Sequence, residues 1–167
     1  MKNRLLACLA LLSSLAYAQK TETLDKFASL DSDIGATINI VKSDAHKISL
    51  EGDESALGHI HWEIDDKNLK IRSDKANMDY SEVVITVQTP SLQVLALTDG
   101  GKATMDKKFS RLDSFVVSAS DDATIDLSNI EFRTLVATSN DGGQIIYKDA
   151  STFVSTSGDG GKVKSIQ

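Results

Sequence analysis

Cysteine and proline are almost missing from this chain of 167 residues, which has one of each, Cys8 and Pro90. A single cysteine cannot form an intramolecular disulfide or a paired-cysteine metal site. No stretch after the first 20 residues approaches the roughly 20 apolar residues that a membrane-spanning helix needs. Aromatic residues make up only 5% of the chain, whereas a dedicated carbohydrate module usually exposes more of them. The sequence therefore excludes a disulfide-stapled protein and one that crosses a membrane with a helix.

The first 18 residues have the pattern of a secretory signal peptide. Lys2 and Arg4 precede an apolar run over residues 5–15, and Ala16-Tyr17-Ala18 has the small-x-small form of a cleavage site. Cleavage there leaves 149 residues, a normal size for one domain. We expect an exported protein, located in the periplasm, on the outer membrane surface or outside the cell.

Cys8 offers a second interpretation of the same segment. Leu5-Leu6-Ala7-Cys8 could be a lipoprotein signal, which would leave the mature protein tethered by an acylated cysteine. The apolar run continues beyond Cys8 instead of ending there, which favours cleavage after Ala18. The mature protein then has no cysteine and no thiol chemistry.

Acidic residues outnumber basic ones, 24 to 18, for a net charge of −6. Removal of Lys2 and Arg4 with the signal peptide makes the balance −8. A surface of this sign disfavours nucleic acid and anionic membranes. We expect no nucleic-acid partner and no insertion into a membrane.

Short segments with alternating apolar and polar residues run through the first half of the chain. Period two with one apolar face is typical of half-buried strands. A helical turn is expected only over residues 54–58, residues 19–26 suggest an irregular leader, and residues 73–81 suggest a loop over one end of the core. The alternating apolar residues are Ile38 and Ile40; Ile48 and Leu50; Ile60, Trp62 and Ile64; Leu69 and Ile71; and Val83, Ile85 and Val87.

The second half repeats one pattern four times, at about 92–110, 112–130, 132–149 and 150–167. Repeats of this length form successive coils of a stacked structure. The sequence predicts an all-β fold, a right-handed β-helix-like solenoid of short strands, as a single domain over residues 27–167. An ungapped stack of the copies predicts one inward column of Leu95, Phe115, Leu135 and Phe153, and a small-residue column of Ala103, Ala123, Gly143 and Gly161.

Two groups of residues are candidate metal ligands. His59, His61 and Glu63 lie at every second position of one strand, so two imidazoles and a carboxylate would share a face and suit zinc. That face is equally well explained as the solvent side of a strand with Ile60, Trp62 and Ile64 inside.

The aspartates of the four repeat turns are the second group, because stacked carboxylates attract Ca²⁺. They lack the glycine-rich nonapeptide of calcium-binding β-rolls, and Asp and Gly suit tight turns without any ligand. The candidates are Asp99, Asp121, Asp141 and Asp159.

Catalytic motifs are missing: the sequence has no Gly-x-Ser-x-Gly elbow and no phosphate-binding loop. A polysaccharide-cleaving enzyme would have to draw its acid and base from residues such as Asp106, Asp126 or Glu131, of which the first two occupy equivalent repeat positions. A cleft with two carboxylates and a basic residue would favour that alternative. We expect no enzyme activity, no catalytic residue and no cofactor.

The order of apolar and glycine positions over about residues 27–166 resembles the putative auto-transporter adhesin head GIN domain family. The resemblance implies a β-helix-like fold, export in Gram-negative bacteria, Bacteroidetes especially, and no established enzyme activity. The first turn departs from the pattern, because Asp99-Gly100-Gly101 sits two residues early in an ungapped stack. The resemblance rests on Phe27-x-x-Leu30, Ile38-x-Ile40, Ile48-Ser-Leu-Glu51, Asn68-Leu69-Lys-Ile71, Val84-Ile-Thr-Val87 and Leu92-x-x-Leu95.

The sequence thus predicts a non-catalytic, adhesin-like envelope or surface module whose flat strand faces bind an unidentified protein or polysaccharide. A polysaccharide-acting enzyme and a metal-dependent binding protein are the alternatives. The last coil has no evident cap, and an uncovered coil exposes strand edges. We expect either a covering by the N-terminal segment or self-association through that end.

Overall fold

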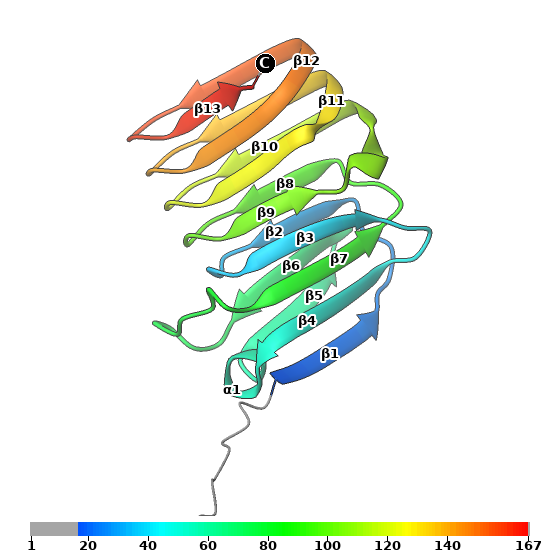
Figure 1. Ribbon diagram of the computed structural model, residues 1–167, viewed down its shortest axis with the longest axis vertical. Coiled ribbons are helices and arrows are strands. Elements are labelled where there is room, and N and C mark those ends of the chain that lie inside the picture. The colour runs from blue at the N-terminus through cyan, green and yellow to red at the C-terminus, as the bar shows by residue number, and fades with distance from the viewer. Residues whose placement is uncertain (1–16, 167) are drawn as a thin grey trace, which may run out of the picture.

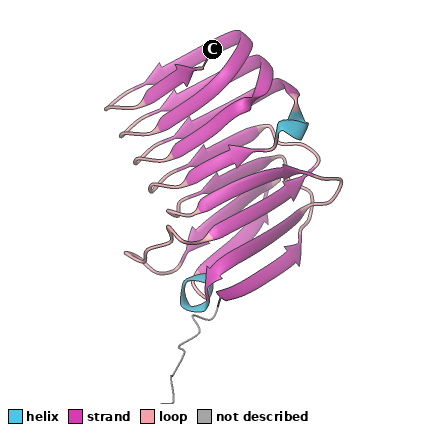
Figure 2. Cartoon of the chain, viewed as in Figure 1, coloured by secondary structure: helices cyan, strands magenta, loops and turns pink. Residues whose placement is uncertain are grey.

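The computed structural model describes residues 17–166, most of which lie in β-strands (Figure 2). Residues 1–16, the greater part of the predicted signal peptide, lie outside the described residues. The elements are β1 (Tyr17–Thr23), β2 (Ser29–Ser32), β3 (Thr37–Lys42), β4 (Lys47–Asp53), α1 (Glu54–Leu57), β5 (Ile60–Asp65), β6 (Asn68–Ser73), β7 (Val84–Thr89), β8 (Val94–Leu97), β9 (Lys102–Met105), the 3-10 turn η1 (Lys107–Phe109), β10 (Arg111–Ala119), β11 (Thr124–Ser139), β12 (Gln144–Ser157) and β13 (Lys162–Ser165).

The strands form one curled sheet in the order β1-β4-β7-β3-β9-β11-β10-β8-β2-β6-β5, with β12 beside β11 and β13 beside β12. The long strands β11 and β12 bend midway, so each belongs to two rows (Figure 1). The front row contains β1, β4, β7, β3, β9, the first halves of β11 and β12, and β13. The back row contains β5, β6, β2, β8, β10 and the second halves of β11 and β12. Apolar side chains of the two rows meet in one core, and the predicted all-β class is confirmed.

Successive coils of the C-terminal half stack in parallel, and the last three copies have the predicted register, with Leu135 beside both Phe115 and Phe153. The first copy is displaced from the predicted register by two residues. Leu95 lies beside Val117, not Phe115, and Ala103 lies beside Ile125, not Ala123. The prediction was wrong by two residues because alternation has a period of two, so a slip of two leaves the same side chains facing inward. The extra length lies between β9 and β10, where η1 forms a turn.

The coils shorten toward the C-terminus. Paired residues are 22 positions apart between the first two coils, then 20, then 18. The side chains of two inward columns become smaller in parallel with this shortening. Toward the C-terminus the two columns read Leu95, Val117, Ala137 and Ser155, and Leu97, Ala119, Ser139 and Ser157.

The N-terminal half departs from a uniform stack of coils. The β2–β3 coil lies between the β6–β7 coil and the β8–β9 coil. The first coil is thus inserted between two coils that follow it in the sequence, while β1 lies at the end of the stack. Three strand pairs are antiparallel, namely β1 with β4, β4 with β7 and β5 with β6. A solenoid of parallel strands throughout, as the sequence predicts, has no such pairs.

The predicted leader over residues 19–26 is another correction, because most of it belongs to β1. Gln19 donates a hydrogen bond to Glu51 at 3.0 Å, and the hydroxyl of Thr21 donates to Ser49 at 3.0 Å. The intervening Lys20 pairs with inward-facing Leu50 of β4. Residues 19–23 of β1 are polar on both faces of the strand. They therefore have no alternating apolar pattern from which a strand could be predicted.

One helical turn, expected over residues 54–58, is present as α1. The Asp53 carboxylate caps it by accepting hydrogen bonds from the amides of Ser55 at 2.9 Å and Ala56 at 3.4 Å. Ala56 and Leu57 are buried. This turn carries the chain from the front row to the back row.

Gly143 lies at a turn where the backbone of the preceding coil passes very close. A Cβ there would collide with the carbonyl group of Ala119. We expect Gly143→Ala to lower the free energy of unfolding by about 1–3 kcal/mol, the usual cost of overpacking a core. Chemical denaturation measures this difference.

Gly58→Ala is the matched control, because a Cβ at that position meets only ordinary contacts at 3.5 and 3.6 Å. Its φ of −63° suits any residue, and we expect a gain of about 0.4–1 kcal/mol. Equal effects of the two substitutions would contradict the stacking register.

Candidate functional site

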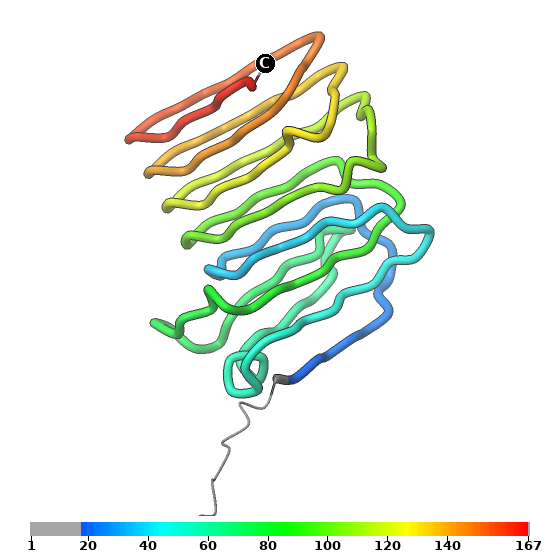
Figure 3. Tube along the Cα trace, viewed as in Figure 1, coloured from blue at the N-terminus to red at the C-terminus, as the bar shows by residue number. Residues whose placement is uncertain are grey.

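The four repeat turns stack along one edge of the molecule (Figure 3), and the hydrogen bonds between them place their aspartates at the same position of successive coils. Each is in the left-handed region, with φ of 54° for Asp99, 51° for Asp121, 46° for Asp141 and 44° for Asp159. The turns are joined by backbone hydrogen bonds. The Gly100 amide donates to the Asp121 carbonyl at 2.7 Å, the Asp122 amide to Asp141 at 2.9 Å, and the Gly142 amide to Asp159 at 3.0 Å.

We call these four hydrogen-bonded turns the turn ladder. Their backbone conformation is enough to explain why aspartate occurs there. Asp tolerates positive φ better than most side chains. Over residues 17–166, no group of three or more His, Cys, Asp or Glu side chains is arranged to hold a metal ion. Calcium binding by the ladder therefore remains a prediction without a coordination geometry to support it.

His59, just before β5, and His61, on β5, both contact a residue that the sequence pattern does not indicate, Asp74. His59 Nδ1 lies 2.8 Å from one carboxylate oxygen of Asp74, and His61 Nε2 lies 2.9 Å from the other. Glu63 instead faces Lys70, at 3.8 Å. The sequence gives no local signal for Asp74, because this residue follows β6. Only the antiparallel pairing of β5 with β6 places it beside the histidines.

Hydrogen bonds from His61, and secondarily from His59, lower the pKa of Asp74. An ionised carboxylate can only accept hydrogen bonds, so both imidazoles donate. Each ring thus uses one nitrogen to hold the start of the loop over residues 74–83. We call the three residues His59, His61 and Asp74 the loop clasp.

A groove of about 710 Å³ lies between that loop and the turns of the two coils above it. Its walls carry Asp33, Asp74, Asp79, Asp99 and Lys75, which satisfies the composition expected of a carbohydrate-cleaving cleft. Three of the four carboxylates have structural partners, however. Asp74 holds the histidines, Asp79 accepts from the Ser81 amide at 2.9 Å, and Asp33 pairs with Arg72 at 3.1 Å.

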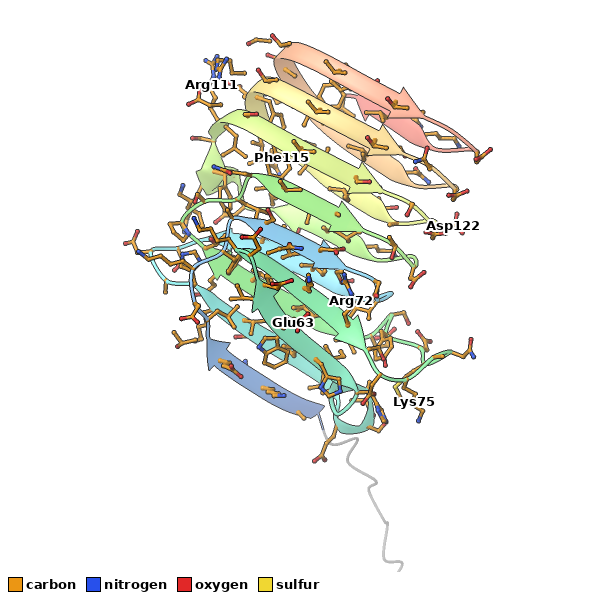
Figure 4. The ribbon with its side chains drawn as sticks, turned by 180° about the vertical axis from the view of Figure 1, so that it is seen from behind. Glu63, Arg72, Lys75, Arg111, Phe115 and Asp122 are labelled. Atoms are coloured by element: carbon orange, nitrogen blue, oxygen red, sulfur yellow. The ribbon has the colours of Figure 1, made fainter. Side chains whose placement is uncertain are left out.

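Asp33 is the most perturbed carboxyl of this groove. Burial raises its pKa more than the Arg72 guanidinium lowers it, and the nearby charges of Asp99 and Asp31 raise it further. Arg72 also binds Asp31, at 2.6 Å, and thus bridges two aspartates of one coil. Figure 4 shows Arg72 on the back row close to the turn edge.

The outer surface of the back row carries an uncharged patch, which we call the neutral strip. Its side chains alternate with buried residues of β8, β10, β11 and β12 and point away from the core. Strand register aligns them in three columns. The columns are Ser114, Thr134 and Thr152; Val94, Val116, Val136 and Val154; and Ala96, Ser118, Thr138 and Thr156.

One ion pair lies at an end of the neutral strip and another lies along one of its sides. Arg72 and Asp31 lie at its lower end, and Arg133 pairs with Asp113 at 3.3 Å along the edge opposite the turns. A shallow groove of about 440 Å³ adjoins the valine column and is lined in part by Leu92. The sequence signal for the strip is Ser/Thr-x-Val-x-Ser/Thr, which occurs three times and contains no titratable group.

Asp106 and Asp126 are not equivalent, contrary to the repeat alignment. Asp126 stacks beside Thr104 and Ile146. Asp106 instead caps η1, where its carboxylate accepts a hydrogen bond from the Lys108 amide at 3.0 Å. Glu131 pairs with Lys148 at 3.2 Å. The three carboxylates proposed for an enzyme therefore share no site.

The sequence pattern of the family described as "Putative auto-transporter adhesin, head GIN domain" matches residues 26–164. The chain belongs to the GIN-domain family. The matched segment runs from just before β2 into β13 and includes the groove and the neutral strip. The resemblance noted in the sequence is thereby confirmed.

Crystal structures of three bacterial proteins share the fold of this GIN domain. A "putative lipid binding protein" of Parabacteroides distasonis has 17% identity and a TM-score of 0.68, over 84% of this chain and 62% of its own. A putative adhesin of Bacteroides fragilis has 14% identity and a TM-score of 0.61, over 92% and 98%. A putative adhesin of Parabacteroides merdae has 12% identity and a TM-score of 0.52, over 90% and 96%.

At these identities the likeness concerns the fold alone. The GIN domain spans 62% of the length of the Parabacteroides distasonis protein. No similar sequence was found among curated proteins. Within residues 17–166, no helix is long and apolar enough to cross a membrane.

The loop clasp has a testable pH dependence. Because the folded-state pKa of Asp74 lies below its ordinary value of 3.8, its contacts stabilise the fold above that pH and are lost as the pH falls through the lowered pKa. We expect Asp74→Asn to reduce the thermal midpoint at pH 7, and the difference from the unmodified protein to disappear in acid. Melting curves from pH 7 to pH 2 measure this.

Asp66→Asn serves as the control, since Asp66 is an exposed hairpin residue with a φ of 48° that Asn also tolerates. An Asp74→Asn protein with the same pH profile as Asp66→Asn would show that the histidines do not hold this loop.

Proposed function

We propose that this GIN domain is an exported, non-catalytic, adhesin-like module that binds its ligand through the neutral strip. One observation carries the proposal. Eleven outward side chains in register, on a chain with a net charge of −6, include no charged residue. The front row has no such surface, because Lys102, Asp126 and Lys162 interrupt it.

The chemistry of the neutral strip fits a neutral, extended polysaccharide. Strands about 4.8 Å apart present rows of hydroxyl groups, each able to donate and accept a hydrogen bond. The valine column between them supplies methyl groups for the apolar faces of sugar rings. A flat array of this kind makes many weak contacts along a chain and needs no deep pocket. The adhesin names of two fold relatives agree with such a role.

The proposal also covers the export of the domain, the fold that displays the strip and the role of its acidic charge. The signal peptide over residues 1–18 directs the chain to the periplasm, the outer membrane surface or the medium. We interpret the parallel coils over residues 92–166 as a short β-solenoid whose flat faces display the strip. Acidic charge keeps nucleic acid and anionic membranes away.

A polysaccharide-cleaving enzyme is the second candidate, and the observation in its favour is the groove where the pKa of Asp33 is raised beside Asp99. A glycosidase needs one carboxyl that stays protonated and one that is ionised. Arg72, which pairs with Asp33, works against the protonated form. Metal-dependent binding is a third candidate, through the turn ladder.

Co-sedimentation with insoluble neutral polysaccharides tests the proposal. We expect Val116→Lys, in the middle of the strip, to weaken binding about tenfold or more, which corresponds to about 1.4 kcal/mol. Gln144→Lys on the front row adds the same charge and should bind like the unmodified protein. Equal binding of both variants and the unmodified protein would overturn the assignment of the strip.

The same assay separates the alternatives. Loss of binding in the presence of EDTA would favour the metal-dependent binder. Release of reducing ends that Asp33→Asn abolishes would favour the enzyme. Binding of cell-surface protein but of no polysaccharide would replace the proposed ligand class while keeping the surface.

A further inference from the structure

The two ends of the strand stack are finished differently. Among the strands of residues 17–166, the second half of β12 and the whole of β13 each have one edge without a pairing strand, at the C-terminal end of the stack. Four large apolar side chains are exposed within residues 17–166, and three of them lie in this terminal coil. They are Phe153, 38% exposed, Val154, 54%, and Ile166, 45%. Phe153 also stacks on Tyr147 with ring centroids 4.7 Å apart.

At the N-terminal end, the edge strand β1 carries charged side chains on its inward side. Lys20 and Glu22 of β1 lie on the side of buried Leu50 and Ile48. The Lys20 ammonium sits 4.3 Å from the ring centroid of Trp62. Inward charges are a known means of preventing a strand edge from pairing with another chain. Because β1 lies at this end, the expected covering of the terminal coil by the N-terminal segment does not occur within the described residues.

The free edge of β12 has none of these protections. From residue 150 to residue 157 it carries no charge and no proline. Every second residue of an edge strand directs its amide and carbonyl groups outward, and a long, uncharged edge is a template for pairing.

We propose that the terminal coil is a dimer interface, at which a second copy of this chain docks end to end about a two-fold axis. Both edge strands of the N-terminal end carry charged residues, Lys20 and Glu22 on β1 and Glu63 and Asp65 on β5. Charged edges disfavour head-to-tail stacking, so we expect the association to stop at two copies. The proposal does not depend on the ligand of the neutral strip. It concerns the free strand edges of the terminal coil, whose outward residues Thr152, Val154 and Thr156 are also the last members of the strip.

Charge selects how the two copies pair. Strands of the two rows run in opposite directions, so a two-fold axis makes every new pair antiparallel. It pairs either β12 with β12 and β13 with β13, or β12 with β13 in both places. Paired residues must face the same side of the sheet. In the first arrangement the outward Lys162 and Lys164 of β13 therefore oppose lysines of the second copy, which is unfavourable.

The second arrangement has no such conflict. It places Lys162 and Lys164 opposite the outward residues of β12, which are uncharged Thr152, Val154 and Thr156. It also brings Phe153 against the inward side of β13, where Val163 lies, and so continues the core across the interface. The pairing of β12 with β13 is the one that the charges allow.

Sedimentation equilibrium of the purified protein after export tests the interface. We expect a monomer–dimer equilibrium without larger species. Val154→Lys would place a third lysine opposite Lys162 and Lys164 and should weaken dimerisation at least tenfold. Val116→Lys, which adds the same charge to the strip away from the free edge, should dimerise like the unmodified protein. Far-ultraviolet circular dichroism establishes that both variants are folded.

A charge swap distinguishes the two arrangements. Adding Lys162→Glu and Lys164→Glu to Val154→Lys should restore the dimer only if β12 pairs with β13. Failure to restore it would overturn that pairing. An unmodified protein that stays monomeric at its highest soluble concentration, or that forms filaments, would overturn the interface itself.

Discussion

The register of the C-terminal half depends on the left-handed turn that each coil makes at its aspartate. Side-chain alternation repeats every two residues, so a coil displaced by two along its neighbour would bury the same face. The hydrogen bonds between Gly100 and Asp121, Asp122 and Asp141, and Gly142 and Asp159 form only when the turns are superposed. The buried columns, the neutral strip and the free edges of the last coil all follow from this register.

Local patterns were enough to predict most strands, the helical turn after Asp53 and the loop after β6. They were insufficient where pairing depends on residues far apart in the chain. The insertion of the β2–β3 coil between two later coils leaves no local signal, and β1 lacks an apolar period because both of its faces are polar. The two-residue register error had a visible warning, since the turn at Asp99 was out of line with the other three. Turn chemistry was the better guide there than the apolar columns.

The candidate sites were predictable to a smaller extent. The histidines of β5 share a face as expected, but their carboxylate partner is Asp74 from across a hairpin, and Glu63 turns to Lys70. Spacing within one strand cannot report what the neighbouring strand brings. The neutral strip was readable in the sequence as Ser114, Thr134 and Thr152 around a valine column. It was missed because uncharged hydroxyl residues resemble an ordinary solvated face until register shows them aligned.

The shortening of the coils from 22 to 20 to 18 residues has a consequence for how the molecule comes apart. One inward position passes from Leu97 through Ala119 and Ser139 to Ser157, so at this position the later coils contribute less apolar surface to the core. In a stack whose units contact only their neighbours, unfolding begins at the weakest interface. The molecule therefore frays from its last coil, while the N-terminal half, locked by its inserted first coil, opens last. Each column of the neutral strip loses its last residue, Thr152, Val154 or Thr156, when the last coil frays, so the length of the strip depends on temperature.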